Sequence, residues 1–174
     1  NANGLQDPDE PGIDNVTVSL LNASQNIIAA TVTQNGGQYV FNDMAAGIYS
    51  LNFQSPDDCI PTCILNGFPG QNSNMDENGN TVLYNFIGGD SIDSIDAGFV
   101  AYGSISGMVW EDKNADGTLN VAEKGMAQKR VFLKGITTCG ENIDIEMLTA
   151  PDGSYLFDKI KPGSYDLHFE INPT

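Results

Sequence analysis

The chain has 174 residues, of which 23 are acidic and 7 are basic, so its formal net charge is −16 at pH 7. Nucleic acids and anionic lipid surfaces are bound through lysine and arginine, and we therefore expect neither as a partner. With 19 glycines, 8 prolines and no long apolar run, the sequence predicts a turn-rich all-β protein without membrane insertion. The first ten residues have no basic region and no apolar core, so no targeting peptide is expected there.

Alternating apolar residues predict six short strands in the first part of the chain. They are expected near residues 15–21, 27–34, 38–42, 47–54, 80–87 and 94–100. Residues 1–100 contain 12 acidic residues and no lysine or arginine. Such a surface repels itself less when it binds divalent cations, which suits an extracellular protein bathed in calcium better than a cytosolic one.

A long polar excursion, residues 55–79, separates the fourth and fifth of these strands. It contains Cys59 and Cys63, which we expect to form a local disulfide that leaves Cys139 over. A metal site is the alternative for this pair. Zinc is disfavoured because the chain has one histidine and no second closely spaced cysteine pair.

Residues 90–95 read DSIDSI. This sequence resembles the Asp-Ser-aliphatic sites that carry O-linked glycans on exported proteins of some bacteria. Ser91 and Ser94 are therefore candidate glycosylation sites. The alternative is an ordinary strand edge without modification.

Residues 112–123 read DKNADGTLNVAE, the pattern of a calcium loop. A hard cation takes about six to eight oxygen ligands, so short acidic and amide side chains must alternate around a tight turn, here at Gly117. The last place needs a carboxylate, and the seventh place offers its backbone carbonyl. The candidate ligands are Asp112, Asn114, Asp116, Thr118, Asn120 and Glu123. The alternative is an acidic surface turn that binds no metal.

Strands, rather than helices, are expected on both sides of this loop. Glycines alternate with Ile105 and Val109 before it, and a β-prone run at residues 131–133 follows it. The strands of the second part are expected near residues 103–111, 129–135, 143–149, 153–158 and 163–171.

The two parts are copies of one unit, because residues 36–53 align with residues 152–169 at a shift of 116 residues. The recurring positions are Tyr39, Phe41, Gly47, Tyr49, Leu51 and Phe53 in the first copy and Tyr155, Phe157, Gly163, Tyr165, Leu167 and Phe169 in the second. Their period of two predicts that the aromatic residues face a core, as we also expect for Trp110. A platform for stacking carbohydrate is the alternative. The single histidine, His168, is expected to face outward.

Residues 1–12 align with residues 114–125, which makes them the remainder of a second calcium loop. Its candidate ligands are Asn1, Asn3, Leu5, Asp7 and Glu10. The acidic residue of the first place, and the strand leading into the loop, would precede Asn1. The second copy likewise ends at Thr174 before its last strands. Because unpaired strand edges are unfavourable, we expect neighbouring repeats or neighbouring molecules to supply the missing strands.

These features predict two tandem Greek-key β-sandwich domains, residues 1–100 and 101–174. Residues 107–125 and 152–169 together resemble the SdrD-type B repeats of bacterial surface proteins. The resemblance covers both copies except the excursion. It implies prealbumin-like, or reverse immunoglobulin-like, sandwiches with Ca²⁺ in the loop after the first strand. A related branch of the family uses a lysine isopeptide bond instead, but the first copy has no lysine.

The resemblance also implies a function, a stiff stalk or extracellular filament at the bacterial cell surface, built from neighbouring repeats of one array or from neighbouring copies. We expect no enzymatic activity, because one outward histidine and no nucleophile motif leave no acid–base constellation. Two alternatives are a ligand- or glycan-binding module that uses residues 55–79, with Phe68, and an accessory domain of a secreted hydrolase.

Overall fold

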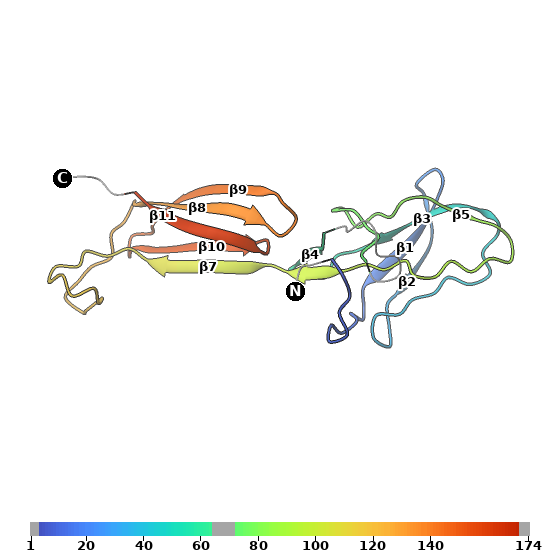
Figure 1. Cartoon of the computed structure of the whole chain (residues 1–174), viewed down its shortest axis with the longest axis horizontal. Helices are drawn as coiled ribbons and strands as arrows, with labels where there is room; N and C mark the ends of the chain where they lie inside the picture. Colours follow the sequence, from blue (N-terminus) through green and yellow to red (C-terminus); the bar gives the residue numbers. More distant parts are fainter. Residues whose placement is uncertain (1–3, 64–71, 171–174) are drawn as a thin grey trace. The chain divides into compact units, whose positions relative to one another are not determined.

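The computed structural model describes residues 4–63 and 72–170. In these residues the regular secondary structure consists of β-strands, joined by turns (Figure 1). This confirms the all-β fold class. The chain divides into two compact units, Asn1–Ala101 and Tyr102–Thr174, with the boundary one residue from the expected position. Among the described residues, none belongs to a helix that could span a bilayer.

The main sheet of the first unit has four antiparallel strands in the order β2-β1-β3-β5 (Figure 1). Their bounds are β1 Thr17–Asn22, β2 Ile27–Val32, β3 Gly47–Phe53 and β5 Tyr84–Phe86. A second, short pair joins β4 (Cys59–Pro61) to β6 (Phe99–Ala101). The buried core of this unit consists of Val16, Val18, Leu20, Leu51, Phe53 and Met75, and Phe99 of β6 packs against it.

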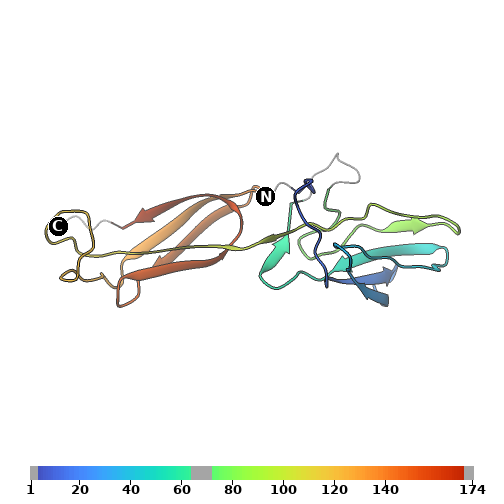
Figure 2. The same ribbon diagram turned by 90° about the horizontal axis from the view of Figure 1, so that it is seen from below.

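The second unit is a sandwich of a three-stranded and a two-stranded antiparallel sheet (Figure 2). The first has the order β11-β8-β9, and the other pairs β7 with β10. The bounds are β7 Gly103–Met108, β8 Arg130–Thr137, β9 Asn142–Leu148, β10 Ser154–Ile160 and β11 Gly163–Phe169. Both sheets contribute to one core of Val131, Leu133, Tyr155, Phe157 and Ile160. The order β9-β8-β11 repeats the order β2-β1-β3 of the first unit.

The structure corrects three expectations. Residues 38–42 are not a strand, because in the described residues no strand lies beside them, whereas their counterpart β10 pairs with β7. Phe169 is 45% exposed although its alternation predicted a core position, and at the end of β11 its ring contacts only the edge of the core, at Tyr155 of β10. The excursion is not wholly a loop, because it contains β4 and contributes Met75, which is 0% exposed, to the core.

A buried threonine holds the same two chain segments together in both units. In the second unit, Thr149 Oγ1 donates to the carbonyl of Met126 at 2.6 Å and accepts the N–H of Lys129 at 3.0 Å. In the first unit, Thr33 makes the matching bonds with Ile13 and Val16, at 2.6 and 2.9 Å. These side chains are 1% and 4% exposed, so each of them satisfies backbone groups that have little access to water.

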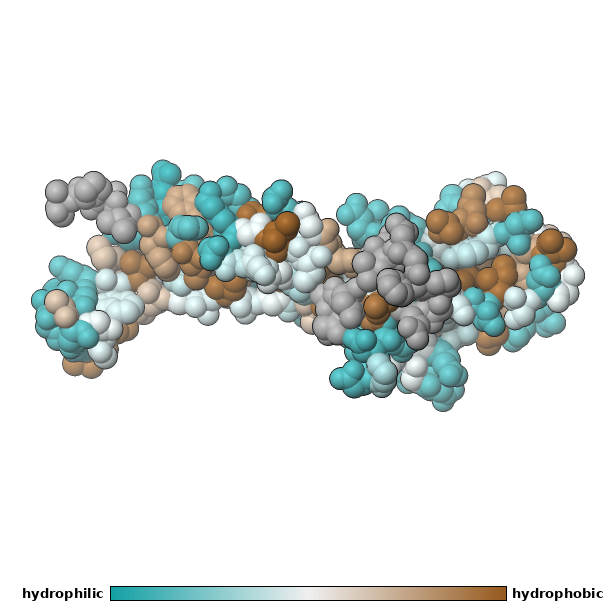
Figure 3. Space-filling model, in the orientation of Figure 1, coloured by the Kyte–Doolittle hydropathy of each residue, from teal (hydrophilic) through white to brown (hydrophobic). Residues whose placement is uncertain are grey.

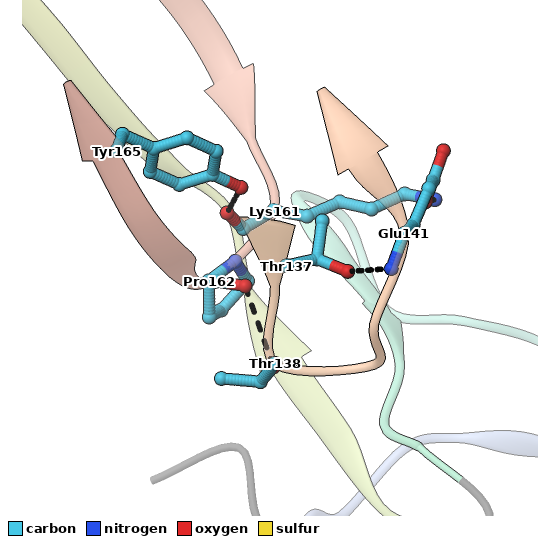
Figure 4. Close-up of polar contacts among 6 residues, drawn as sticks. All are labelled: Thr137, Thr138, Glu141, Lys161, Pro162 and Tyr165. Carbon is cyan, nitrogen blue, oxygen red and sulfur yellow. Dashed lines mark hydrogen bonds and ion pairs between the residues drawn. The ribbon is translucent and has the colours of Figure 1, made fainter. Parts of the chain in front are cut away.

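In each unit, a tyrosine near the start of a strand fixes the turn that precedes this strand, β11 in the second unit and β3 in the first. Tyr165 Oη donates to the carbonyl of Lys161 at 2.6 Å, and Tyr49 Oη donates to that of Ala45 at 3.0 Å. Figure 4 shows the first of these beside the β8–β9 turn, where the hydroxyl of Thr138 donates to the carbonyl of Pro162 at 3.3 Å. Burial raises the pKa of the Tyr165 hydroxyl, and the nearby Glu141 adds to this effect. The hydroxyl therefore remains a donor at neutral pH.

We expect Thr149→Val to destabilise the second unit by about 1–3 kcal/mol, because an isosteric methyl leaves the Lys129 N–H and the Met126 carbonyl without their partner. Urea unfolding followed by circular dichroism measures the loss. Thr138→Val is the matched control, since Thr138 is exposed and its side-chain bond is long at 3.3 Å; a change within about 0.5 kcal/mol is expected. Equal losses in the two variants would contradict this role of Thr149.

Candidate calcium loops

The loop after β7 is closed at its base by backbone pairing. Trp110 pairs with Gly125, and the N–H of Glu111 donates to the carbonyl of Lys124 at 3.1 Å. The N–H of Met126 donates to the carbonyl of Val109 at 2.8 Å. Residues between these contacts form an exposed, mostly hydrophilic lobe (Figures 1 and 3). The two sides of the loop are thus held together independently of any ligand.

The base of the loop admits no side chain at Gly125. A Cβ atom at this position would overlap the carbonyl oxygen of Asp152, and at the matching Gly12 it would overlap the carbonyl oxygen of Gly36. Gly125 therefore lets the end of the loop lie directly against the turn before β10. Gly12 does the same in the first unit, against the turn before residues 38–42.

Asp112 folds over the tight turn of the loop. Its Oδ1 accepts the N–H of Asp116 at 3.2 Å, and its Oδ2 accepts the N–H of Gly117 at 2.9 Å. Gly117 has a φ of 73°, a left-handed conformation that glycine adopts without strain. The carboxylate of the first place is therefore exposed but folded back onto the turn by two backbone hydrogen bonds.

Glu123 closes the loop from the other end. Its Oε1 accepts the N–H of Lys113 at 3.0 Å, and its Oε2 accepts the N–H of Asn120 at 3.1 Å. One carboxylate thus connects the second, ninth and twelfth places. The ammonium group of Lys113 lies 3.8 Å from Glu111, an acid outside the predicted ligand places.

Asp116 lies at the centre of the network. Its Oδ1 accepts the N–H of Thr118 at 2.7 Å, and its Oδ2 accepts side-chain N–H groups of Asn114 at 2.7 Å and Asn120 at 3.2 Å. These bonds, led by the one from Thr118, lower the pKa of the Asp116 carboxyl. This carboxylate therefore stays ionised at a lower pH than an ordinary aspartate.

The structure brings all six predicted ligands of this loop into one hydrogen-bonded network, in which the carbonyl of Thr118 accepts from Asn120 at 3.1 Å. Within the described residues, however, no three carboxylates converge at metal-binding distance. The donor set of three carboxylates, two amides and a carbonyl fits a hard cation. A half-turn of the Asn114 and Asn120 amide groups would direct their oxygens, rather than their N–H groups, toward the centre.

The first unit repeats the closing part of this loop. The N–H of Asp7 donates to Glu10 Oε2 at 3.2 Å, as that of Asn120 does to Glu123 at 3.1 Å. The N–H of Glu10 donates to the carbonyl of Asp7 at 3.0 Å, and the second unit has the same bond between Glu123 and Asn120. Leu5 pairs with Asn72 of the excursion. Asn1 and Asn3 lie outside the described residues.

The predicted disulfide between Cys59 and Cys63 is wrong, because the thiol of Cys59 is free. Cys59 begins β4 and pairs with Ala101, and the N–H of Thr62 donates to the carbonyl of Gly98. The backbone is therefore extended here. An extended chain separates residues four apart by roughly 13 Å, about twice the Cα distance that a disulfide allows.

The other predicted sites are spread over the surface or lie outside the described residues. Ser91 and Ser94 are exposed and belong to no strand, and their glycosylation stays a prediction. His168 is exposed, as expected. Phe68 lies outside the described residues. The paired buried threonines, Thr33 and Thr149, were not predicted, although their recurrence at the shift of 116 residues was a usable signal.

Two copies of an antiparallel unit, each preceded by an acidic loop with the same closing glutamate, define a tandem β-sandwich repeat protein. The chain belongs to the SdrD B-like domain family, whose model matches residues 1–99 and 103–174. Membership in this family makes the chain a structural repeat of a bacterial surface protein, with an extracellular location.

Two relatives illustrate this membership. The chain is 36% identical over 172 residues to the serine-aspartate repeat-containing protein F of Staphylococcus epidermidis (strain ATCC 12228 / FDA PCI 1200), covering 98% of this chain and 10% of the relative. It is 34% identical over 174 residues to the serine-aspartate repeat-containing protein D of Staphylococcus aureus (strain Newman), covering 98% and 12%. The chain thus spans about a tenth of the length of these relatives.

One solved structure is also similar, that of a tetra-tandem repeat in the extending region of a large adhesion protein. It shares 12% sequence identity over 91% of this chain and 41% of that chain, with a TM-score of 0.19.

We expect Gly125→Ala to destabilise the second unit by about 1–3 kcal/mol, because the added methyl forces the loop base away from Asp152. Gly103→Ala is the control, since the nearest atom to its added methyl, Ile160 O, lies 3.7 Å away. Thermal unfolding of both variants and the parent measures the difference. The tight packing at the loop base is refuted if the two alanine variants melt together.

Proposed function

We propose that the chain is a calcium-stabilised structural repeat, a rigid spacer within the stalk of a surface protein. The observation that carries the proposal is the arrangement of residues 112–123, in which the side chains of the predicted ligand places fold into one loop closed by Glu123. Aspartates that accept backbone N–H groups also occur at Asp14 and Asp76, but only residues 112–123 place oxygen-bearing groups at all the ligand places of a calcium loop within the described residues.

Electrostatics supports a cation in this place. Asp112, Asp116 and Glu123 are held together within one short loop, and like charges at close range repel one another. A divalent cation converts this repulsion into attraction between the two ends of the loop. Since the base of the loop adjoins β7 and the turn at Gly153, ordering the loop also orders the end of the sandwich.

The first unit supports the same function through its matching closing segment. Glu10 holds Asp7 as Glu123 holds Asn120. The first unit also has no lysine or arginine to neutralise its 12 acidic residues, so its surface gains from bound divalent cations. We therefore propose a calcium site in each repeat, with Asn1, Asn3 and Leu5 as further ligands of the first.

The contribution to stability follows from linkage. A site with a dissociation constant on the order of 1 μM, exposed to about 1 mM calcium, stabilises the folded state by roughly 4 kcal/mol. A site with a dissociation constant near 1 mM contributes only some tenths of a kcal/mol. Only the tighter site would stiffen a stalk.

We expect calcium to raise the melting temperature of the second unit by more than about 10 °C, and the Asp112→Asn, Glu123→Gln double variant to lose this rise. Calorimetric titration of the calcium-free protein and melting with and without chelator measure both effects. Glu111→Gln is the matched control, because it removes a neighbouring acidic charge that is not at a ligand place. A parent protein that binds no calcium and melts identically with chelator would overturn the proposal.

Competition between protons and calcium for the loop carboxylates gives a second test of the proposal. Because the pKa of Asp116 is lowered by its hydrogen bonds, we expect this carboxylate to stay ionised, and available to calcium, as the pH falls from 7 to 5. Calorimetric titrations at pH 7, 6 and 5 measure this dependence, and a loss of affinity already at pH 6 would contradict it.

A further inference from the structure

The strands of the main sheet in the first unit contain no charged residue. Neither β1, β2, β3 nor β5 has an acidic or basic side chain, and residues 15–42 as a whole are uncharged. The 12 acidic residues of the segment 1–100 therefore all lie outside these strands. The sheet is thus an uncharged region in a unit that otherwise repels acidic proteins, including copies of itself.

The matching sheet of the second unit has the opposite character. Its strands β9, β8 and β11 have the same order as β2, β1 and β3. Across β8 and β9, Lys134 Nζ lies 2.8 Å from Asp144 Oδ2, and Arg130 Nε lies 3.4 Å from Glu146 Oε1. The two basic residues alternate along β8 with its buried core residues, so the ion pairs lie on the face directed away from the core.

The two sheets can be matched position by position, because their paired residues follow the same register. Thr17 lies opposite Val32 in the first unit, as Arg130 lies opposite Leu148 in the second. Counted from these pairs, every member of the two ion pairs has an uncharged counterpart in the first unit. The counterparts are Thr17 for Arg130, Leu21 for Lys134, Ile27 for Asp144 and Ala30 for Glu146. The first unit thus has the same sheet without its charges.

β2 lies at the edge of its sheet (Figure 1). In the described part of the chain, no strand pairs with its outer side. Ile27, Ile28 and Val32 are 65%, 51% and 41% exposed. Edge strands of natural proteins commonly carry charged side chains that prevent pairing with other chains, as β9 does with Asp144 and Glu146. β2 has no such charge, which leaves its edge open to another strand.

The backbone of β2 directs hydrogen-bonding groups outward. The carbonyl of Thr17 accepts the N–H of Gln54 at 2.9 Å, so the backbone groups of Thr17 point toward β3 and away from β2. Val32, which lies opposite Thr17, therefore directs its own N–H and C=O away from β1, and Ala30 does the same because this direction alternates along a strand. Such groups are a template for strand addition. β5, at the other edge, has three residues and offers a shorter template.

Charge selects the kind of strand that fits this edge. A charged side chain placed against β2 would lose water and find no opposite charge there. The partner strand must therefore be uncharged, and β2 itself, with the sequence IIAATV, meets this condition. A two-fold axis through Ala30 places Ala30 opposite the same residue of a second copy and Ile28 opposite Val32. Small side chains then lie at the axis, with aliphatic pairs on both sides of it.

We propose that the chain forms a dimer with a second copy of itself through β2, antiparallel and edge to edge, with Ala30 at the two-fold axis. The main sheets of the two first units then form one continuous sheet whose strands carry no charge. The second unit does not pair in this way, because Asp144 and Glu146 would bring like charges together at the edge of β9. The proposal depends neither on calcium binding nor on residues beyond this chain.

Sedimentation equilibrium of the whole chain with chelator present, from about 10 μM to about 1 mM, measures the association. We expect a monomer–dimer equilibrium that salt strengthens, because screening reduces the repulsion between two acidic copies and the interface has no ion pair to lose.

We expect Ala30→Glu to weaken the dimer at least about tenfold, because it sets two like charges face to face at the axis. The second unit has glutamate at the matching place, so the substitution is compatible with the fold. Asn85→Glu is the matched control, since it adds the same charge at an exposed position of β5, in the same sheet. We expect it to change the dissociation constant by less than about threefold.

Amide hydrogen exchange of the parent protein tests the edge without any variant. We expect the N–H groups of Ala30 and Val32 to become protected as the concentration rises, while the protection of the amides in β5 stays unchanged. A chain that stays monomeric at every concentration would overturn the proposal. A dimer that Ala30→Glu leaves intact, a dimer that salt weakens, or new protection at β5 in place of β2 would also overturn it.

Discussion

The two units depend on covering one apolar sheet face with a second layer of strands. In the second unit, Val131 and Leu133 of β8 are fully buried because Tyr155 and Phe157 of β10 pack over them. Burying such side chains contributes about 1.5–3 kcal/mol each, which a single sheet exposed to water could not obtain. β7 in turn holds β10 in register, so the sandwich requires both strands of the thinner layer.

The acidic loop is connected directly to the two-stranded layer formed by β7 and β10. It begins where β7 ends and returns beside the turn that leads into β10, with Gly125 and Gly153 allowing close backbone contact. A ligand that orders the loop therefore acts on the strand pair that covers the core. This connection is the physical route by which the proposed calcium ion would stiffen a repeat.

Within the described residues, the two units differ in whether a strand pairs with the aromatic motif. In the second unit β7 pairs with the aromatic motif, which forms β10 with buried side chains; in the described part of the first unit no strand pairs with residues 38–42, which are irregular. Identical local sequence patterns thus take different structures. Strand formation here is a property of the pair, since an isolated extended segment has no hydrogen-bond partners of its own.

The sequence by itself determined the all-β class, the duplication and the position of ten of the observed strands. It also determined the loop that gathers Asp112, Asp116 and Glu123. These features could be predicted because period-two alternation and ligand spacing are local properties of the sequence. Only the tertiary structure decided that Met75 enters the core, that Thr149 joins two distant segments, that residues 38–42 are no strand and that Cys59 stays free. Each of these depends on which segment lies opposite, and contacts between residues distant along the chain leave no trace in local spacing.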